Sequence, residues 1–189
     1  GRQFKIITFA YGYSTTAPTG GVTVDKDLCI WYAAWGDMRY SLSDSKQMTS
    51  IRTDYNAWIA ATTGDDNGSL ILWLYDVCYN NYVKYFGTSM TAIDRIVDEA
   101  KTAGVEMILV LGAYDADNIW QSEMRSYVWS RKLTDSSLSA VTLRDNFVRA
   151  YFGATAADYV TGYINDYDGY FADQGLGYEV VHGTEYMRK

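Results

Sequence analysis

Short apolar runs alternate with helical periodicities along the first two thirds of the chain. The runs predict four strands, near residues 4–11, 28–34, 69–75 and 105–111. Strands that are buried on both faces need continuous apolar residues, and strands joined through helices pair in parallel by right-handed crossovers. The pattern therefore predicts an α/β fold with a four-stranded parallel sheet.

Two helices are expected between the later strands. The first is predicted to begin near Asp44, because Gln47 three residues later would complete a capping box. The second is predicted to have Thr88 or Ser89 as its N-cap and to end at Gly104. Its apolar residues recur at i, i+3, i+4 and i+7, which predicts one buried stripe formed by Ile93, Ile96, Val97 and Ala100.

The last third of the chain shows helical periodicities only. We expect residues 1–116 to form the strand-and-helix part, and residues 117–189 to add C-terminal helices and a tail. No linker separates the two parts, so residues 1–189 are expected to form a single domain. The chain lacks an initial Met and enters a strand within a few residues, so we expect it to be a fragment of a longer protein.

Charge and residue usage exclude several classes of function. A net charge of −7 disfavours nucleic acid and anionic membranes as partners, and no apolar stretch reaches the about 18 residues of a membrane span. The single histidine, His182, argues against a Ser/His/Asp mechanism and a His-based metal site. Cys29 and Cys78 are expected to pack as free thiols, with a disulfide between them as the alternative. No glycine-rich phosphate loop follows a strand, which argues against nucleotide binding. We expect no cofactor and no metal.

Aromatic residues are frequent, with 18 Tyr and 6 Trp. They gather with acidic residues at the ends of three apolar runs, in residues 29–35, 70–76 and 107–115. Flat aromatic faces beside hydrogen-bonding carboxylates suit a sugar or a similar ring ligand. The alternative is ordinary packing between layers, because alternate residues along a strand face the helices.

Several short motifs follow one another in order along the chain. They are Ala10-Tyr11-Gly12, Tyr40 to Asp44, Asn56 to Trp58, Leu72 to Asp76, Asn81-Tyr82, Ala103-Gly104-Val105, Tyr127 to Asp135 and Phe147 to Ala157. Taken together, the series resembles the bacterial domain-of-unknown-function family 4838, over residues 4–170. The resemblance implies a glycoside-hydrolase-like TIM barrel of which this chain is the C-terminal half. We expect the full-length bacterial protein to be secreted or located at the cell surface.

In such barrels the C-terminal ends of the strands form the binding face. The candidate catalytic residues are Asp76 and Asp115, since they end adjacent predicted strands and glycoside hydrolysis uses two carboxyl groups. The alternative for each aspartate is a helix cap or a solvated loop residue. The candidate substrate-binding residues are Tyr11, Trp31, Trp35, Tyr75, Tyr79, Tyr114 and Asp117.

We therefore predict a parallel four-stranded half of a TIM-like (β/α) barrel, followed by a C-terminal helical segment. The predicted function is that of a fragment of a glycoside-hydrolase-like, carbohydrate-active protein, inactive by itself. A noncatalytic carbohydrate-binding or scaffold module is the first alternative, and a small flavodoxin-like domain is the second. A half barrel leaves two sheet edges unpaired, so we expect either a homodimer or a missing N-terminal barrel half as the partner.

Overall fold

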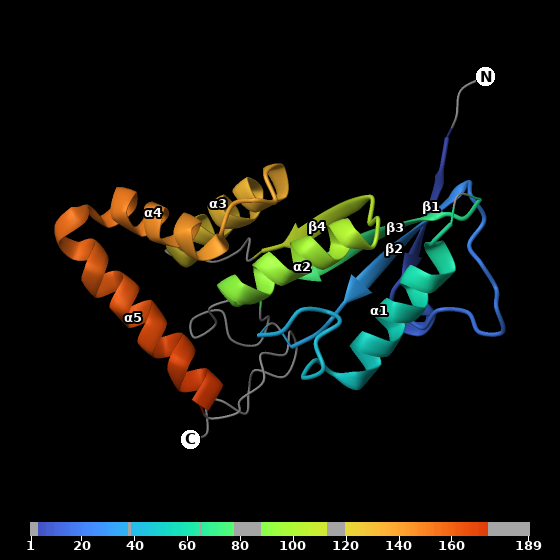
Figure 1. Ribbon diagram of the computed structural model, residues 1–189, viewed down its shortest axis with the longest axis horizontal. Coiled ribbons are helices and arrows are strands. Elements are labelled where there is room, and N and C mark those ends of the chain that lie inside the picture. Colours follow the sequence, from blue (N-terminus) through green and yellow to red (C-terminus); the bar gives the residue numbers. More distant parts are fainter. Residues whose placement is uncertain (1–3, 38, 65, 78–87, 113–119, 174–189) are drawn as a thin grey trace.

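The structure is a computed structural model, and it describes residues 4–37, 39–64, 66–77, 88–112 and 120–173. Within these residues the chain forms one parallel sheet of four strands with helices against it (Figure 1). The strands lie in the order β1-β2-β3-β4, and all three neighbouring pairs are parallel. Their bounds are β1 Ile6–Ala10, β2 Leu28–Ala34, β3 Ser69–Tyr75 and β4 Met107–Leu111.

The helices follow the strands in the expected alternation. A short 3-10 helix, η1, covers Gly12–Ser14 after β1. The α-helices are α1 Thr49–Thr62, α2 Met90–Thr102, α3 Trp120–Thr134, α4 Ala140–Phe152 and α5 Ala154–Asp173. Helix α4 packs against α2, α3 and α5 and so joins the C-terminal helices to the rest (Figure 1). None of the described helices is long and apolar enough to cross a membrane.

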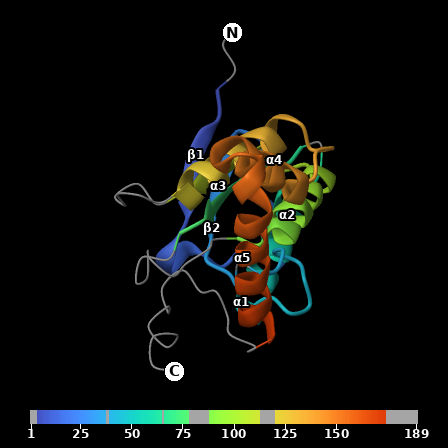
Figure 2. The same cartoon turned by 90° about the vertical axis from the view of Figure 1, so that its left-hand side faces the viewer.

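Helices α1 and α2 lie on the same face of the sheet (Figure 2). Side chains alternate along a strand, so every second residue of β2 and β3 points into this layer. These residues are buried and form the core with the helices: Ile30, Tyr32, Ala34, Leu70, Leu72 and Leu74. The continuous apolar runs of the two strands thus serve both faces, as is typical of parallel sheets.

Helix α2 agrees closely with its sequence pattern. Its predicted stripe is buried, and the hydroxyl of Ser89 accepts a hydrogen bond from the Ala92 amide, as expected of an N-cap. Gly104 has φ 71°, the left-handed conformation that ends the helix. Both details confirm the sequence-based boundaries of this helix.

The predicted start of α1 near Asp44 is wrong, because the helix begins at Thr49. The amide group of Gln47 is used elsewhere: its oxygen accepts from the Asp37 amide at 2.7 Å, and its nitrogen donates to the Asp37 carbonyl at 2.9 Å. A buried side chain committed to the loop after β2 is not available to cap a helix at Asp44. The hydrogen bonds of Gln47 to the Asp37 backbone therefore replace the capping box that the sequence predicts.

The architecture is α/β, and it is consistent with half of a (β/α) barrel followed by C-terminal helices. Cys29 is a buried free thiol in β2. Cys78 and His182 lie outside the described residues.

Candidate functional site

The face of the sheet opposite α1 and α2 carries a continuous cluster of aromatic rings, which we call the aromatic face. It consists of Phe9, Tyr11, Trp31, Trp35, Trp73 and Tyr75. Phe9 stacks on Trp31 with ring centroids 5.2 Å apart, and Trp31 lies 5.9 Å from Trp73. The rings come from β1, β2 and β3 and the residues that follow β1 and β2, so parallel pairing brings distant parts of the sequence together.

Three of these rings meet at the C-terminal ends of the strands, and we call them the aromatic rim. The Trp35 ring lies 5.6 Å from Tyr11 and 5.1 Å from Tyr75. Tyr75 is buried, whereas Tyr11 is 45% exposed. The accessible ring of Tyr11 is therefore supported by Trp35 of the rim and by Trp73, on which it stacks with ring centroids 5.9 Å apart.

The opposite, N-terminal end of the aromatic face is polar. Lys5, just before β1, donates to the Oγ of Ser69 at 3.0 Å and to the Oε2 of Glu106 at 2.8 Å. The hydrogen bond from Lys5 lowers the pKa of the Glu106 carboxyl, with Ser69 contributing in the same direction. This half-exposed pair links the starts of the two outer strands across the sheet.

Two polar atoms of the aromatic face lack partners. The Nε1 atoms of Trp31 and Trp73 are buried and donate no hydrogen bond. An unpaired buried N–H group is costly, because its hydration is lost without replacement. At the centre of the aromatic face the two indole N–H groups are thus shielded from solvent. Groups that can hydrogen-bond a ligand lie at its two ends, with Lys5 at one and the half-exposed Tyr11 at the other.

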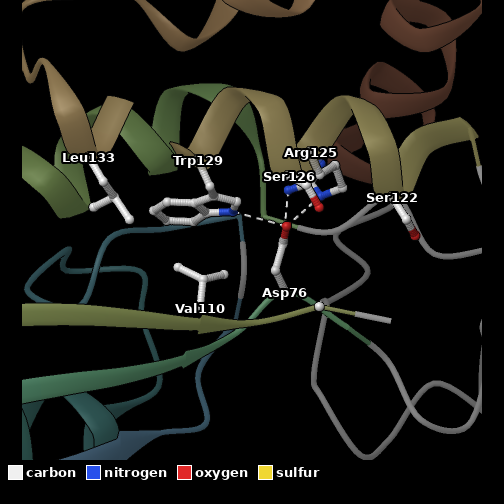
Figure 3. Close-up of a pocket in the computed structure, with 8 residues that line it drawn as sticks. Asp76, Val110, Ser122, Arg125, Ser126, Trp129 and Leu133 are labelled. Atoms are coloured by element: carbon white, nitrogen blue, oxygen red, sulfur yellow. Dashed lines mark hydrogen bonds and ion pairs between the residues drawn. The ribbon is translucent and has the colours of Figure 1, made fainter. Parts of the chain in front are cut away.

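Asp76 follows β3 but points away from the aromatic face. It continues the alternation of Leu72 and Leu74, which face the helices. Its carboxylate forms a bidentate ion pair with Arg125 of α3, with Nε–Oδ2 and Nη2–Oδ1 distances of 2.7 Å (Figure 3). Trp129 Nε1 donates to the same carboxylate at 2.9 Å, and the Thr88 amide donates at 2.6 Å.

This environment determines what Asp76 can do chemically. Both carboxylate oxygens accept at least two hydrogen bonds, and the side chain is buried. A general acid must instead carry a proton that it can deliver to a substrate. These hydrogen bonds fit a structural role in which Asp76 connects the end of β3 to α3 and to the start of α2.

A second aspartate, Asp37, lies after β2 and is also engaged. It accepts from the Arg39 side chain at Nε (3.1 Å) and Nη2 (2.8 Å). Asp37 and Arg39 are both largely shielded from solvent. Asp37 and Asp76, which closely follow the rim residues Trp35 and Tyr75 in sequence, are thus both held in ion pairs.

A cavity of about 280 Å³ lies between β4 and α3. The Asp76–Arg125 pair forms part of its wall, and the remaining lining comes from Val110, Gly112, Ser122, Ser126, Trp129 and Leu133 (Figure 3). Within the part of the chain that the structure describes, no group of three His, Cys, Asp or Glu residues could hold a metal ion.

Residues 3–165 match the sequence profile of the family described as Domain of unknown function (DUF4838). The chain belongs to the DUF4838 family. No curated protein and no solved structure matches it. The family assignment confirms the resemblance drawn from the ordered motifs, and it assigns no activity.

For this DUF4838 chain, the structure brings together four of the predicted substrate-binding residues: Tyr11, Trp31, Trp35 and Tyr75. The other substrate-binding candidates lie outside the described residues: Tyr79, Tyr114 and Asp117. So does Asp115, the second candidate catalytic residue. Trp73 joins the cluster although it was not among the candidates; its odd-numbered position, shared with Tyr75, is the signal that places it on the same face.

Sequence reasoning also missed the partners of Asp76. Arg125 and Trp129 are four residues apart, so they lie on one side of α3. That spacing was visible in the sequence, but nothing local indicated that this side would meet β3.

Proposed function

We propose that this DUF4838 chain binds a saccharide at the aromatic rim formed by Tyr11, Trp35 and Tyr75, as part of a glycoside-hydrolase-like, carbohydrate-active bacterial protein. The single observation that carries the proposal is that the Trp35 ring contacts both Tyr11 and Tyr75 at the C-terminal ends of parallel strands. Ligands of parallel barrels bind at this end. A half-exposed tyrosine ring can stack on the apolar face of a sugar, and its hydroxyl can hydrogen-bond the sugar's own hydroxyl groups.

Binding without turnover is the form of the proposal that the described residues support best. Asp76, the described member of the candidate catalytic pair, is held by Arg125 and Trp129. Hydrolysis by a carboxyl pair is the second candidate, since the ends of β3 and β4 are adjacent: the Asp76 amide donates to the Leu111 carbonyl at 2.8 Å. It would require the carboxylate of Asp76 to leave its ion pair.

The test is a calorimetric or glycan-array screen with neutral and acidic oligosaccharides, followed by titration of variants with any ligand found. Tyr11→Ala should weaken binding by about tenfold, the effect of removing one anchoring aromatic ring. Tyr13→Ala is the matched control, because this tyrosine lies two residues away and is fully exposed.

Equal losses in both variants, or no saccharide binding in the screen, would contradict the proposal. Release of reducing sugar by the wild-type chain that disappears in Asp76→Asn, with the fold retained, would favour hydrolysis over simple binding.

A further inference from the structure

Trp35, the central ring of the aromatic rim, lies just beyond the end of its strand. The pairing of β2 with β3 ends at Ala34 and Leu74. Trp35 is the next residue, and its ring lies 5.6 Å from Tyr11 and 5.1 Å from Tyr75. Because Trp35 lies outside the register of the sheet, the segment that follows it takes part in fixing its position.

The buried side chain of Gln47 holds that segment. Its Oε1 atom accepts from the Asp37 amide at 2.7 Å, and its Nε2 atom donates to the Asp37 carbonyl at 2.9 Å. Nε2 also donates to the carbonyls of Tyr40 and Ser41, both at 3.3 Å, and Oε1 accepts from the Met48 amide at 2.9 Å. Gln47 is only 3% exposed. This one side chain therefore binds backbone groups at both ends of the loop between β2 and α1.

Gly36 places the amide of Gln47 next to Trp35. A Cβ at Gly36 would lie 2.9 Å from both Nε2 and Oε1 of Gln47. The favourable separation of non-bonded carbon atoms is about 3.5–4.0 Å, so even a methyl group at this position would displace the amide. The amide of Gln47 thus packs directly against the residue that follows Trp35.

The N-cap of α2 holds the same loop, but farther from Trp35. The hydroxyl of Ser89 donates to the Arg39 carbonyl at 3.2 Å. Arg39 comes later in the loop, whereas Gln47 contacts the two residues that immediately follow Trp35. Of these two anchors, Gln47 is the one that acts directly beside the ring.

We propose that Gln47 is the positioning residue of the aromatic rim. Its amide holds the two residues after Trp35 and thereby sets the tilt of the Trp35 ring, which is 57° to Tyr11 and 68° to Tyr75. Loss of the amide changes the geometry of the rim and with it the affinity for a ring ligand. The effect on ligand affinity rests on the proposed function, whereas the effect on the Trp35 ring does not.

The test is near-ultraviolet circular dichroism of the chain, which reports the fixed packing of aromatic rings. The contribution of Trp35 is the difference between the spectra of the wild type and Trp35→Phe. Gln47→Ala and Gly36→Ala should each remove most of this contribution, the first by deleting the amide and the second by displacing it. Far-ultraviolet circular dichroism of each variant establishes that the helices remain folded.

Gln47→Glu tests the hydrogen bonds without changing the size of the side chain. An ionised carboxylate only accepts, so it cannot replace Nε2 as the donor to the three carbonyl groups. Protonation restores a donor, and burial beside these carbonyls raises the pKa of the new carboxyl. The variant should lack the Trp35 contribution at about pH 8 and regain it at about pH 5, whereas that of the wild type should be the same at both.

Asn67→Ala is the matched control. The Asn67 amide donates to the Thr63 carbonyl and lies against Gly64, so it also supports a loop beside a glycine, but at the N-terminal end of β3. This variant should keep the Trp35 contribution. With a saccharide ligand in hand, Gln47→Ala should weaken binding by about tenfold, as expected for Tyr11→Ala, and Asn67→Ala should leave binding unchanged.

A folded Gln47→Ala or Gly36→Ala variant that keeps the Trp35 contribution would overturn the proposal. An equal loss in Asn67→Ala would also overturn it, as would a Gln47→Glu variant whose Trp35 contribution does not respond to pH. If the alanine variants fail to fold, Gln47→Glu decides. The spectroscopic readouts need no ligand, so absence of saccharide binding contradicts the proposed function alone.

Discussion

Asp76 at the end of β3 and Arg125 on α3 form a buried bidentate ion pair, with both N–O distances at 2.7 Å. Arg125 also donates to the carbonyl of Thr88, whose amide donates to Asp76. The pair thereby connects the sheet, the start of α2 and the C-terminal helices. Removing one member leaves the other charge buried without its partner.

Asp76→Asn is therefore expected to lower the free energy of unfolding by about 3–5 kcal/mol, the usual cost of breaking a buried ion pair. The measurement is urea unfolding followed by circular dichroism. Asp158→Asn serves as the control, because Asp158 is highly exposed and lies 3.7 Å from Arg149; it should change stability by less than about 0.5 kcal/mol. An Asp76→Asn variant as stable as the wild type would contradict the structural role and return Asp76 to the catalytic candidates.

Gly68, just before β3, allows a close approach of two chain segments. A Cβ at this position would lie 2.5 Å from the Leu28 carbonyl oxygen and from Val24 Cγ1, and 2.7 Å from the Asp25 carbonyl oxygen. Two of these neighbours are backbone atoms, which cannot rotate away. Gly68→Ala should therefore destabilise the chain by about 2 kcal/mol or more, by the mechanism of overpacking.

Gly162 provides the comparison for that substitution. It lies within α5, and a Cβ there meets no atom within 4 Å. Gly162→Ala should stabilise the chain by about 0.5–1 kcal/mol through helix propensity. Thermal unfolding of both variants gives opposite shifts of Tm if the geometry is right, and equal shifts would contradict it.

The hydroxyl of Tyr32 is fully buried between the sheet and the helices and has no hydrogen-bond partner. Burial raises the pKa of this tyrosine, and the nearby charge of Asp54 adds to the effect. Because an unsatisfied buried hydroxyl carries a desolvation cost, Tyr32→Phe should raise the free energy of unfolding by about 1 kcal/mol. A loss of stability in the same urea assay would show instead that the hydroxyl has a bonding partner, such as a buried water.

The strands could be predicted from the sequence because burial on both faces requires continuous apolar residues. The predicted ranges of β2 and β3 match the structure. The same continuity hides which residues face which layer: Trp31 and Tyr32 are both apolar in bulk, yet one belongs to the aromatic face and the other to the core. The alternation of side chains along a strand assigns each residue to a face, but only after one residue of that strand is known to face the helices.

The direction of Asp76 illustrates what local patterns omit. Its parity with Leu72 and Leu74 was visible in the sequence and predicts a side chain toward the helices. Its partner could not be predicted, because Arg125 lies 49 residues away and reaches Asp76 only through the packing of α3 on the sheet. The clustering of Tyr11, Trp35 and Tyr75 was predictable, since it follows from parallel pairing alone.

Asp168 on α5 gives a prediction for pH dependence. Burial raises the pKa of its carboxyl, and the positive charges of Arg125 and Arg144 offset this only in part. A raised folded-state pKa means that the contribution to stability is fully present below the unfolded value, about pH 4, and is lost as the pH rises through the folded value. Asp168→Asn should therefore stabilise the chain at pH 7 relative to the wild type, with a smaller difference near pH 4.

The comparison of the two pH values is made by urea unfolding, with Asp166→Asn as the control. Asp166 lies on the same helix and is exposed, so its substitution should change the free energy of unfolding by less than about 0.5 kcal/mol. If Asp168→Asn destabilises the chain at pH 7, the attraction from Arg125 and Arg144 outweighs the burial of the carboxyl. Asp168 would then support the docking of α5 rather than oppose it.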